Sequence, residues 1–89
     1  MRIGLAGVGR IGAFHAATLQ AVQDVDTVVV ADAVPSRARE VAAALGVESV
    51  DSPEALLDAG IDGLVIAAAT SAHAALVVAG VEAGLPTFC

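Results

Sequence analysis

The chain has 89 residues, 57% of them hydrophobic, with no Trp, no Tyr and two Phe, so it forms at most one small domain with an aliphatic core. Ten acidic residues against four basic ones give a net charge of −6, which argues against nucleic acid and anionic membranes as partners. Cys89 is the only cysteine, so an internal disulfide is excluded and a reducing, cytoplasmic location is expected.

The first segment predicts a strand, a glycine-rich turn and a helix. Residues 2–6 form a short apolar run typical of a strand, and Gly7-Val8-Gly9-Arg10-Ile11-Gly12 follows directly. Apolar or small residues then recur at helical spacing and predict a helix over residues 10–22: Ile11, Phe14, Thr18 and Val22.

Each glycine of this turn suits a different physical requirement. Gly7 permits backbone angles that a side chain would forbid. Gly9 lets the main chain approach a pyrophosphate, and Gly12 lets the helix lie close to the sheet. The N–H groups of Arg10 and Ile11 would then point at the phosphates, helped by the positive end of the helix dipole.

A second apolar run, residues 28–31, ends at Asp32, twenty residues past Gly12. A carboxylate here accepts hydrogen bonds from the hydroxyls of the adenosine ribose and repels a 2′-phosphate, which favours NAD over NADP. Strand, glycine turn, helix, strand and acid in this order form the dinucleotide-binding fingerprint. Two alternatives remain open: a structural turn that binds nothing, and Asp32 as a residue that merely flanks a helix.

The middle of the chain predicts a second helix and a third strand. Pro35 suits the first turn of that helix, and Gly46 stops it. Its apolar face comprises Ala38, Val41, Ala42 and Leu45. A short strand is expected over residues 47–50, and then a brief helix that ends at Gly60, with Ser52 as N-cap and Pro53 in its first turn.

The last third predicts a strand over residues 63–68, a helix and a final strand over residues 85–89. The helix begins near Ser71 and ends at Gly84, and Gly80 inside it indicates close packing. Its expected inner face is Leu76, Val77 and Val81. Residues 64–81 carry no formal charge and are numerous enough to span a membrane, but polar interruptions and acidic flanks favour a strand and helix.

Alternating strands and helices predict an α/β fold, a doubly wound parallel sheet of the Rossmann type with strand order 3-2-1-4-5. The final strand would leave apolar residues on an edge, which isolated proteins normally cover or charge. We therefore expect residues 1–89 to be one incomplete dinucleotide-binding domain, truncated before a second α+β domain that carries the substrate site.

Five segments also carry a resemblance to a known family: residues 3–12 with Phe14 and His15, residues 30–32, residues 61–67, Thr70 with His73, and residues 82–89. Together they resemble the N-terminal domain of the Gfo/Idh/MocA oxidoreductases, and within that family the inositol 2-dehydrogenases and related polyol or sugar enzymes. The resemblance implies hydride transfer between a cyclic polyol or sugar and NAD, and a homo-oligomer at full length.

In such relatives, the last strand runs into a Glu-Lys-Pro motif, and a histidine of the second domain accepts the proton. This chain contains no lysine, so the acid–base residues of the family cannot be assigned in it. No catalytic residue and no metal ligand is therefore named, and the chain alone is expected to be inactive. The resemblance places the loop with Ala69, Thr70 and His73 beside the nicotinamide half of the cofactor. Ala69 stands where relatives usually have proline.

Several of these roles have plainer alternatives. Thr70 or Ser71 can cap a helix, with His73 as an ordinary first-turn side chain. Arg37 can stack on the adenine ring, or it can be an exposed charge. His15 is better explained by packing than by phosphate contact. As a whole, the chain can also be a non-catalytic module that senses dinucleotides, or the cofactor half of another class of Rossmann dehydrogenase.

Overall fold

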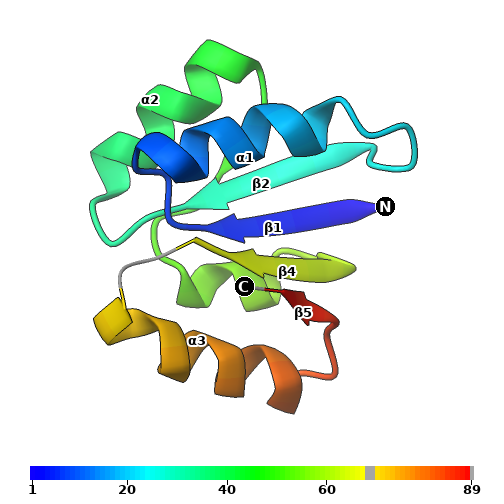
Figure 1. The fold of residues 1–89 in the computed structure, drawn as a ribbon, viewed down its shortest axis with the longest axis vertical. Helices are drawn as coiled ribbons and strands as arrows, with labels where there is room; N and C mark the ends of the chain where they lie inside the picture. The colour runs from blue at the N-terminus through cyan, green and yellow to red at the C-terminus, as the bar shows by residue number, and fades with distance from the viewer. Residues whose placement is uncertain (68–69, 89) are drawn as a thin grey trace.

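The computed structural model of the chain describes residues 1–67 and 70–88, without the side chains of residues 10, 11, 13 and 70–72. Strands and helices alternate along the described chain (Figure 1). They are β1 (Arg2–Ala6), α1 (Arg10–Gln20), β2 (Thr27–Ala31), α2 (Pro35–Leu45), β3 (Glu48–Ser49), the 3-10 helix η1 (Glu54–Asp58), β4 (Gly63–Ile66), α3 (Thr70–Glu82) and β5 (Thr87–Phe88).

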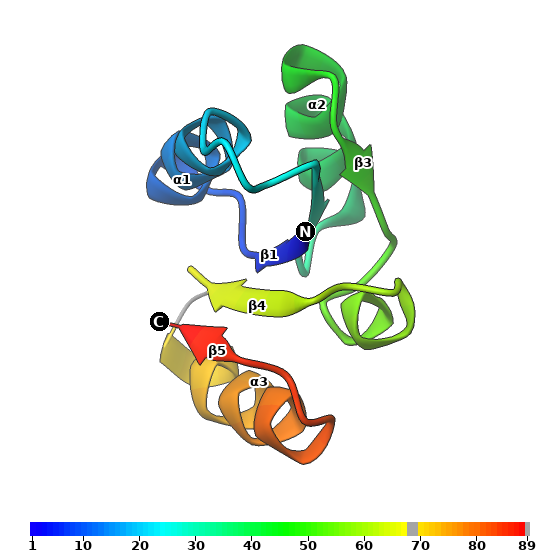
Figure 2. The same ribbon diagram turned by 90° about the vertical axis from the view of Figure 1, so that its right-hand side faces the viewer.

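The strands form one parallel sheet in the order β3-β2-β1-β4-β5, which confirms the predicted topology. The central strand β1 pairs with β2 along its whole length and with β4 from Ile3↔Gly63 to Ala6↔Ile66. Figure 2 shows β3 and β5 at the two edges. Because all strands are parallel, their carboxyl ends lie along one edge of the molecule.

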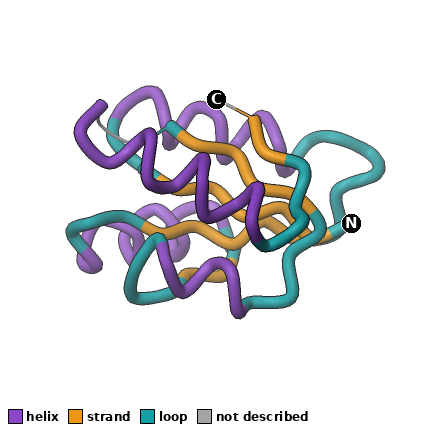
Figure 3. Tube along the Cα trace, turned by 90° about the horizontal axis from the view of Figure 1, so that it is seen from below, coloured by secondary structure: helices purple, strands orange, loops and turns teal. Residues whose placement is uncertain are grey.

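Helices cover both faces of the sheet (Figure 3). Residues of α1 and α2 contribute to the core on one face, and residues of η1 and α3 contribute to the core on the other. Successive strand residues therefore face two separate cores, as expected for strands buried on both faces. Leu5 and Val30 pack with Ala16, Ala38 and Ala42. The second core contains residues from the other face of β1 and β2, from β4 and the segment before it, and from η1 and α3: Ala6, Val29, Ala31, Leu56, Ile61, Leu64, Ile66 and Leu76.

The apolar spacing that predicts α1 does not mark its buried face. Phe14 is 69% exposed, and Thr18 and Val22 are exposed as well. Gly12 and Ala16 face the sheet instead. The physical reason lies at position 12, where the helix is so close to the Gly7 carbonyl group that an added Cβ would collide with it. Further along the same face, the half-buried Leu19 packs against the core.

Most other local predictions are confirmed. Pro35 begins α2, whose buried residues are Ala38 and Ala42, and Gly46 ends it with φ +70°. The brief helix is the 3-10 helix η1, but its N-cap is Pro53 rather than Ser52, and it ends at Asp58. The Ser52 hydroxyl accepts a hydrogen bond from the Ala55 N–H (3.2 Å).

Three predictions in the last third need correction. The final strand, predicted over residues 85–89, is observed over Thr87–Phe88, and residue 89 lies outside the described part of the chain. The predicted inner face of α3 consisted of Leu76, Val77 and Val81. Leu76 is buried and Val77 is half-buried, but the prediction is wrong at Val81, which is exposed. The predicted fourth strand extends beyond the observed one, which ends at Ile66. Among the helices that the structure describes, none has both the length and the apolar character needed to cross a membrane.

Candidate cofactor site

The turn between β1 and α1 uses its glycines in opposite ways. Gly7 has φ +98°, a conformation that side chains disfavour, and its N–H donates to the Ala31 carbonyl (2.8 Å). A Cβ added to Gly12 would lie 2.8 Å from the carbonyl carbon of Gly7, and nearer still to its oxygen. A Cβ added to Gly9 would meet no atom within 4 Å. Gly12 is therefore required by packing, whereas the space at Gly9 is open.

That open space lies at the amino end of α1. Gly9 is the N-cap of the helix and has no side chain, and the first turn contains no acidic residue. The first N–H groups of a helix lack acceptors within it and, with the helix dipole, attract anions. A backbone that can be approached closely, next to such a helix end, fits a pyrophosphate.

Asp32 follows β2 and is only 7% exposed. Its Oδ2 accepts the Val8 N–H and its Oδ1 accepts the Val34 N–H, each at 2.9 Å. The Arg37 guanidinium lies 3.9 Å from Oδ1, which is an ion pair rather than a hydrogen bond. A carboxylate can accept about four hydrogen bonds, so Asp32 retains the capacity to accept two ribose hydroxyls.

These groups line a hollow of about 280 Å³, called here the carboxyl-end hollow, at the carboxyl edge of the sheet. Its lining comes from the β1–α1 turn, the end of β2, α2, the segment before η1 and the end of β4: Gly7, Gly9, Asp32, Ala33, Arg37, Pro53 and Ala67. Ligand pockets usually measure about 300–1,000 Å³. The hollow is therefore large enough for one part of a dinucleotide, on the side of Asp32.

The structure gathers four of the predicted site residues around this hollow: Gly7, Gly9, Asp32 and Arg37. The backbone of Arg10 and Ile11 begins α1, as expected, and Gly12 is buried behind the turn. The predictions at Thr70 and Ala69 are not tested, because the side chain of Thr70 and the whole of Ala69 lie outside the description. His73 lies on α3, half-buried, and does not line the hollow.

Three lining residues were not predicted from the sequence: Ala33, Pro53 and Ala67. Ala33 and Ala67 follow β2 and β4, so the rule that ligands bind at the carboxyl ends of parallel strands could have found them. Pro53 could not be found in this way, because three residues separate it from the end of β3 and its position depends on how η1 packs.

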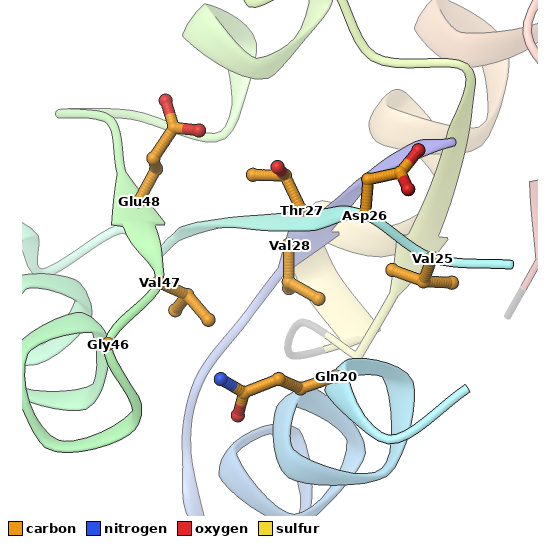
Figure 4. Close-up of a pocket in the computed structure, with 8 residues that line it drawn as sticks. All are labelled: Gln20, Val25, Asp26, Thr27, Val28, Gly46, Val47 and Glu48. Atoms are coloured by element: carbon orange, nitrogen blue, oxygen red, sulfur yellow. The ribbon is translucent and has the colours of Figure 1, made fainter. Parts of the chain in front are cut away.

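A second hollow, of about 220 Å³, lies at the opposite edge of the sheet (Figure 4). Three of its polar side chains, those of Gln20, Asp26 and Glu48, already interact within the chain. Gln20 donates to the Leu45 carbonyl (2.7 Å), Glu48 pairs with Arg2 (2.9 Å), and Asp26 pairs with the N-terminal ammonium. Figure 4 shows Val28 and Val47 on the side that faces Gln20. This hollow is therefore a packing feature rather than a ligand site.

The comparisons with known proteins agree with this geometry. The family model described as "Oxidoreductase family, NAD-binding Rossmann fold" matches residues 1–89. The chain is 36% identical to myo-inositol 2-dehydrogenase of Thermotoga maritima over 100% of its own length and 27% of that protein.

Two solved structures show the same fold. A putative myo-inositol dehydrogenase from Sinorhizobium meliloti superposes with a TM-score of 0.90 at 40% identity, over 100% of this chain and 27% of that one. Scyllo-inositol dehydrogenase from Lactobacillus casei, solved with NAD(H) and scyllo-inositol, superposes with a TM-score of 0.86 at 26% identity, over 98% of this chain and 26% of that one. The chain thus spans about 27% of the length of its curated relatives, and it belongs to the Gfo/Idh/MocA oxidoreductase family as an NAD-binding Rossmann domain.

Proposed function

We propose that this chain is the cofactor-binding part of an oxidoreductase that transfers a hydride between NAD and a cyclic polyol or sugar, such as myo-inositol. One observation carries the proposal: the open space at Gly9, above the amino end of α1, adjoins the buried Asp32 carboxylate in one hollow. The substrate class is supported by the relatives, which are named as inositol dehydrogenases.

The diphosphate would lie over Gly9 and accept hydrogen bonds from the first N–H groups of α1, including those of Arg10 and Ile11. The Asp32 carboxylate, held by the N–H groups of Val8 and Val34, would accept the ribose hydroxyls. Arg37 stands at the rim of the same hollow, where a guanidinium can stack on adenine. This arrangement orients the adenosine half of the cofactor.

We assign the nicotinamide half to the loop after β4. The residues assigned to it are Ala69 and, at the beginning of α3, Thr70 and His73. They follow the carboxyl end of β4, where ligands of open α/β sheets bind. The bound nicotinamide ring supplies the hydride acceptor or donor. The proton of the alcohol needs a base within hydrogen-bond reach of it, and this chain contains no lysine that could take that role.

The remaining parts of the proposal concern the whole protein. Its substrate would bind to a second domain, and the full-length chains would form a homo-oligomer in the cytoplasm. The short span relative to the relatives supports the second domain, and the single cysteine supports the cytoplasmic location. The homo-oligomer rests on the resemblance to the family alone. The expected substrate is a small molecule, and the net charge of −6 argues against nucleic acid and anionic membranes.

NADH titration of Asp32→Ala and Gly9→Val tests the cofactor site. Removing Asp32 deletes hydrogen bonds from the ribose to a charged group, each worth about 1.5–3 kcal/mol, so affinity should fall at least about tenfold. Val at position 9 fills the open space and should weaken binding similarly. Arg39→Met is the control, because Arg39 pairs with the exposed Asp51 outside the hollow. Wild-type affinity in both Asp32→Ala and Gly9→Val would refute the proposed site.

A further inference from the structure

We propose that Asp32 also builds the diphosphate site: through the Val8 N–H, its carboxylate holds the β1–α1 turn in the shape that leaves the space over Gly9 open. Asp32 thereby becomes a positioning residue for the diphosphate, in addition to the ribose contact assigned above. The inference rests on the proposed function, because it concerns the same cofactor. It deepens that function by making one side chain responsible for two neighbouring parts of the site.

Two consecutive N–H groups attach the turn to the end of β2. The Gly7 N–H donates to the Ala31 carbonyl (2.8 Å), and the Val8 N–H donates to Asp32 Oδ2 (2.9 Å) in a buried bond. The first bond joins backbone to backbone, so it survives a change of side chain. The second depends on the Asp32 side chain, and a substitution at position 32 would remove it.

The Val8 bond fixes the backbone directly before the open space. Val8 is 2% exposed, and its side chain belongs to the core that contains Leu5 and Val30, while its N–H points to the carboxylate. Gly9 follows as the N-cap of α1. A shift of Val8 would therefore move Gly9 and change the direction of the first helical N–H groups, to which the diphosphate is assigned.

Loss of the carboxylate would leave the Val8 N–H without its acceptor. A buried N–H without a partner is strongly disfavoured, so the turn would leave its present conformation for part of the time. The apparent affinity of a ligand falls in proportion to the fraction of molecules in the binding-competent state. Removing the Asp32 carboxylate should therefore weaken the binding of a diphosphate even where no ribose is present.

Electrostatic repulsion alone predicts the opposite result. Asp32 lines the same hollow as Gly9, so its negative charge repels a diphosphate bound there. If charge were the only effect, removing the carboxylate would strengthen the binding of inorganic diphosphate. The two explanations differ in the sign of the change, and a probe without ribose distinguishes them.

The test titrates inorganic diphosphate into the isotope-labelled chain and follows the backbone amide signals at the beginning of α1 by NMR. These signals belong to Gly9, Arg10 and Ile11, which lie at the site assigned to the diphosphate. Inorganic diphosphate contains no ribose, so a change in its affinity does not report the ribose contact of Asp32. The same samples are titrated with NADH.

Asp32→Ser is the main variant, and Asp32→Ala is the second. The serine hydroxyl can still accept the N–H of Val34, two residues along the chain, but the side chain is shorter than that of aspartate and leaves the Val8 N–H without an acceptor. Alanine provides an acceptor for neither N–H. We expect both variants to bind diphosphate at least about threefold more weakly than the wild type, despite the loss of a repelling charge.

Two control variants separate charge and stability from positioning. Asp51→Ala removes an exposed carboxylate that pairs with Arg39 and lies two residues before Pro53 of the hollow. Gly80→Ala introduces a collision with Thr87 and so lowers stability without a change in the turn. We expect Asp51→Ala to keep or slightly raise the affinity for diphosphate, and Gly80→Ala to keep it.

The outcomes separate this inference from the proposed function. Failure of the wild type to bind NADH would refute the function itself. If the wild type binds NADH, three results refute the inference alone: diphosphate leaves the amide signals of the wild type unchanged, both Asp32 variants bind it as tightly as the wild type or more tightly, or Gly80→Ala loses as much affinity as they do.

Thermal unfolding checks that both Asp32 variants are folded. A measurement on the wild type does not depend on their folding. Without any ligand, the Val8 amide should exchange its hydrogen at least about tenfold more slowly than an unprotected amide, because the carboxylate holds it. Exchange at the unprotected rate would show that the turn is not held and would refute the inference.

Discussion

Substituting alanine at Gly12 or at Gly9 should separate the two uses of glycine in the β1–α1 turn. The added atom is one methyl group in both variants, and both positions lie at the beginning of α1. At Gly12 the methyl group would collide with the carbonyl group of Gly7, whereas at Gly9 it would meet no protein atom within 4 Å. We therefore expect Gly12→Ala to reduce stability and Gly9→Ala to reduce cofactor binding.

The magnitude at Gly12 follows from the distances. Non-bonded carbon atoms pack about 3.5–4.0 Å apart, and the added Cβ would be 2.8 Å from the Gly7 carbonyl carbon. Overpacking costs about 1–3 kcal/mol, and alanine is favoured over glycine inside a helix by about 1 kcal/mol. The obstacle is backbone, which cannot rotate away, so we expect a net loss of about 2 kcal/mol. For a domain of this size that lowers Tm by about 8 °C or more.

At Gly9 the backbone angles, φ −63° and ψ −169°, are accessible to alanine. Stability should therefore change by about 0.5 kcal/mol or less. The methyl group would project into the space assigned to the diphosphate, so affinity for NADH should fall at least about tenfold, or 1.4 kcal/mol.

Circular dichroism during thermal unfolding and NADH titration measure the two effects in the same samples. The reasoning is refuted if Gly12→Ala unfolds at the wild-type temperature. It is also refuted if Gly9→Ala binds NADH as the wild type does, or loses as much stability as Gly12→Ala.

Three further predictions concern the packing and the activity of the chain. Leu56→Ala should lower the free energy of unfolding in urea by about 2–5 kcal/mol, because Leu56 is fully buried. Leu57→Ala should lower it less, because Leu57 is only half-buried. Equal losses in the two variants would contradict this prediction. Gly80→Ala should lower the free energy of unfolding by about 1–2 kcal/mol, because the added Cβ would lie 2.5 Å from Thr87 Oγ1. The double variant Gly80→Ala/Thr87→Ala should recover part of this stability. If it recovers none, the contact with Thr87 is not the cause of the loss. With NAD and myo-inositol, the 89-residue chain should form no NADH by absorbance, and measurable turnover would show that a base is present in it.

The sequence was most informative where a feature depends on neighbouring residues. Pro35 marks the beginning of α2 and Gly46 marks its end, because each of these helix ends depends on the backbone angles of a single residue. The strand order followed from alternation and from the handedness of parallel crossovers. The position of Asp32 beside the glycine turn followed from the same topology, since β1 and β2 end side by side.

Features that depend on how particular side chains pack between elements were not predicted. The outward position of Phe14 follows from the approach of α1 to its own turn, which apolar spacing does not reveal. The hydrogen bonds from Val8 and Val34 to Asp32 depend on side-chain rotation at the end of β2. Pro53 reaches the hollow because η1 is anchored by Leu56 against the sheet.

The central position of β1 also has a consequence for how the protein is made. Its first neighbour, β2, begins at residue 27, but its second, β4, begins only at residue 63. During synthesis, the β1–α1 turn and Asp32 can therefore come together early, once β1 and β2 have emerged. The other edge of β1 stays unpaired until a much longer stretch of chain has emerged. Pairings between distant segments slow folding and expose strand edges in the interval. Slowing translation between β2 and β4 should therefore prolong the period in which the nascent chain can aggregate.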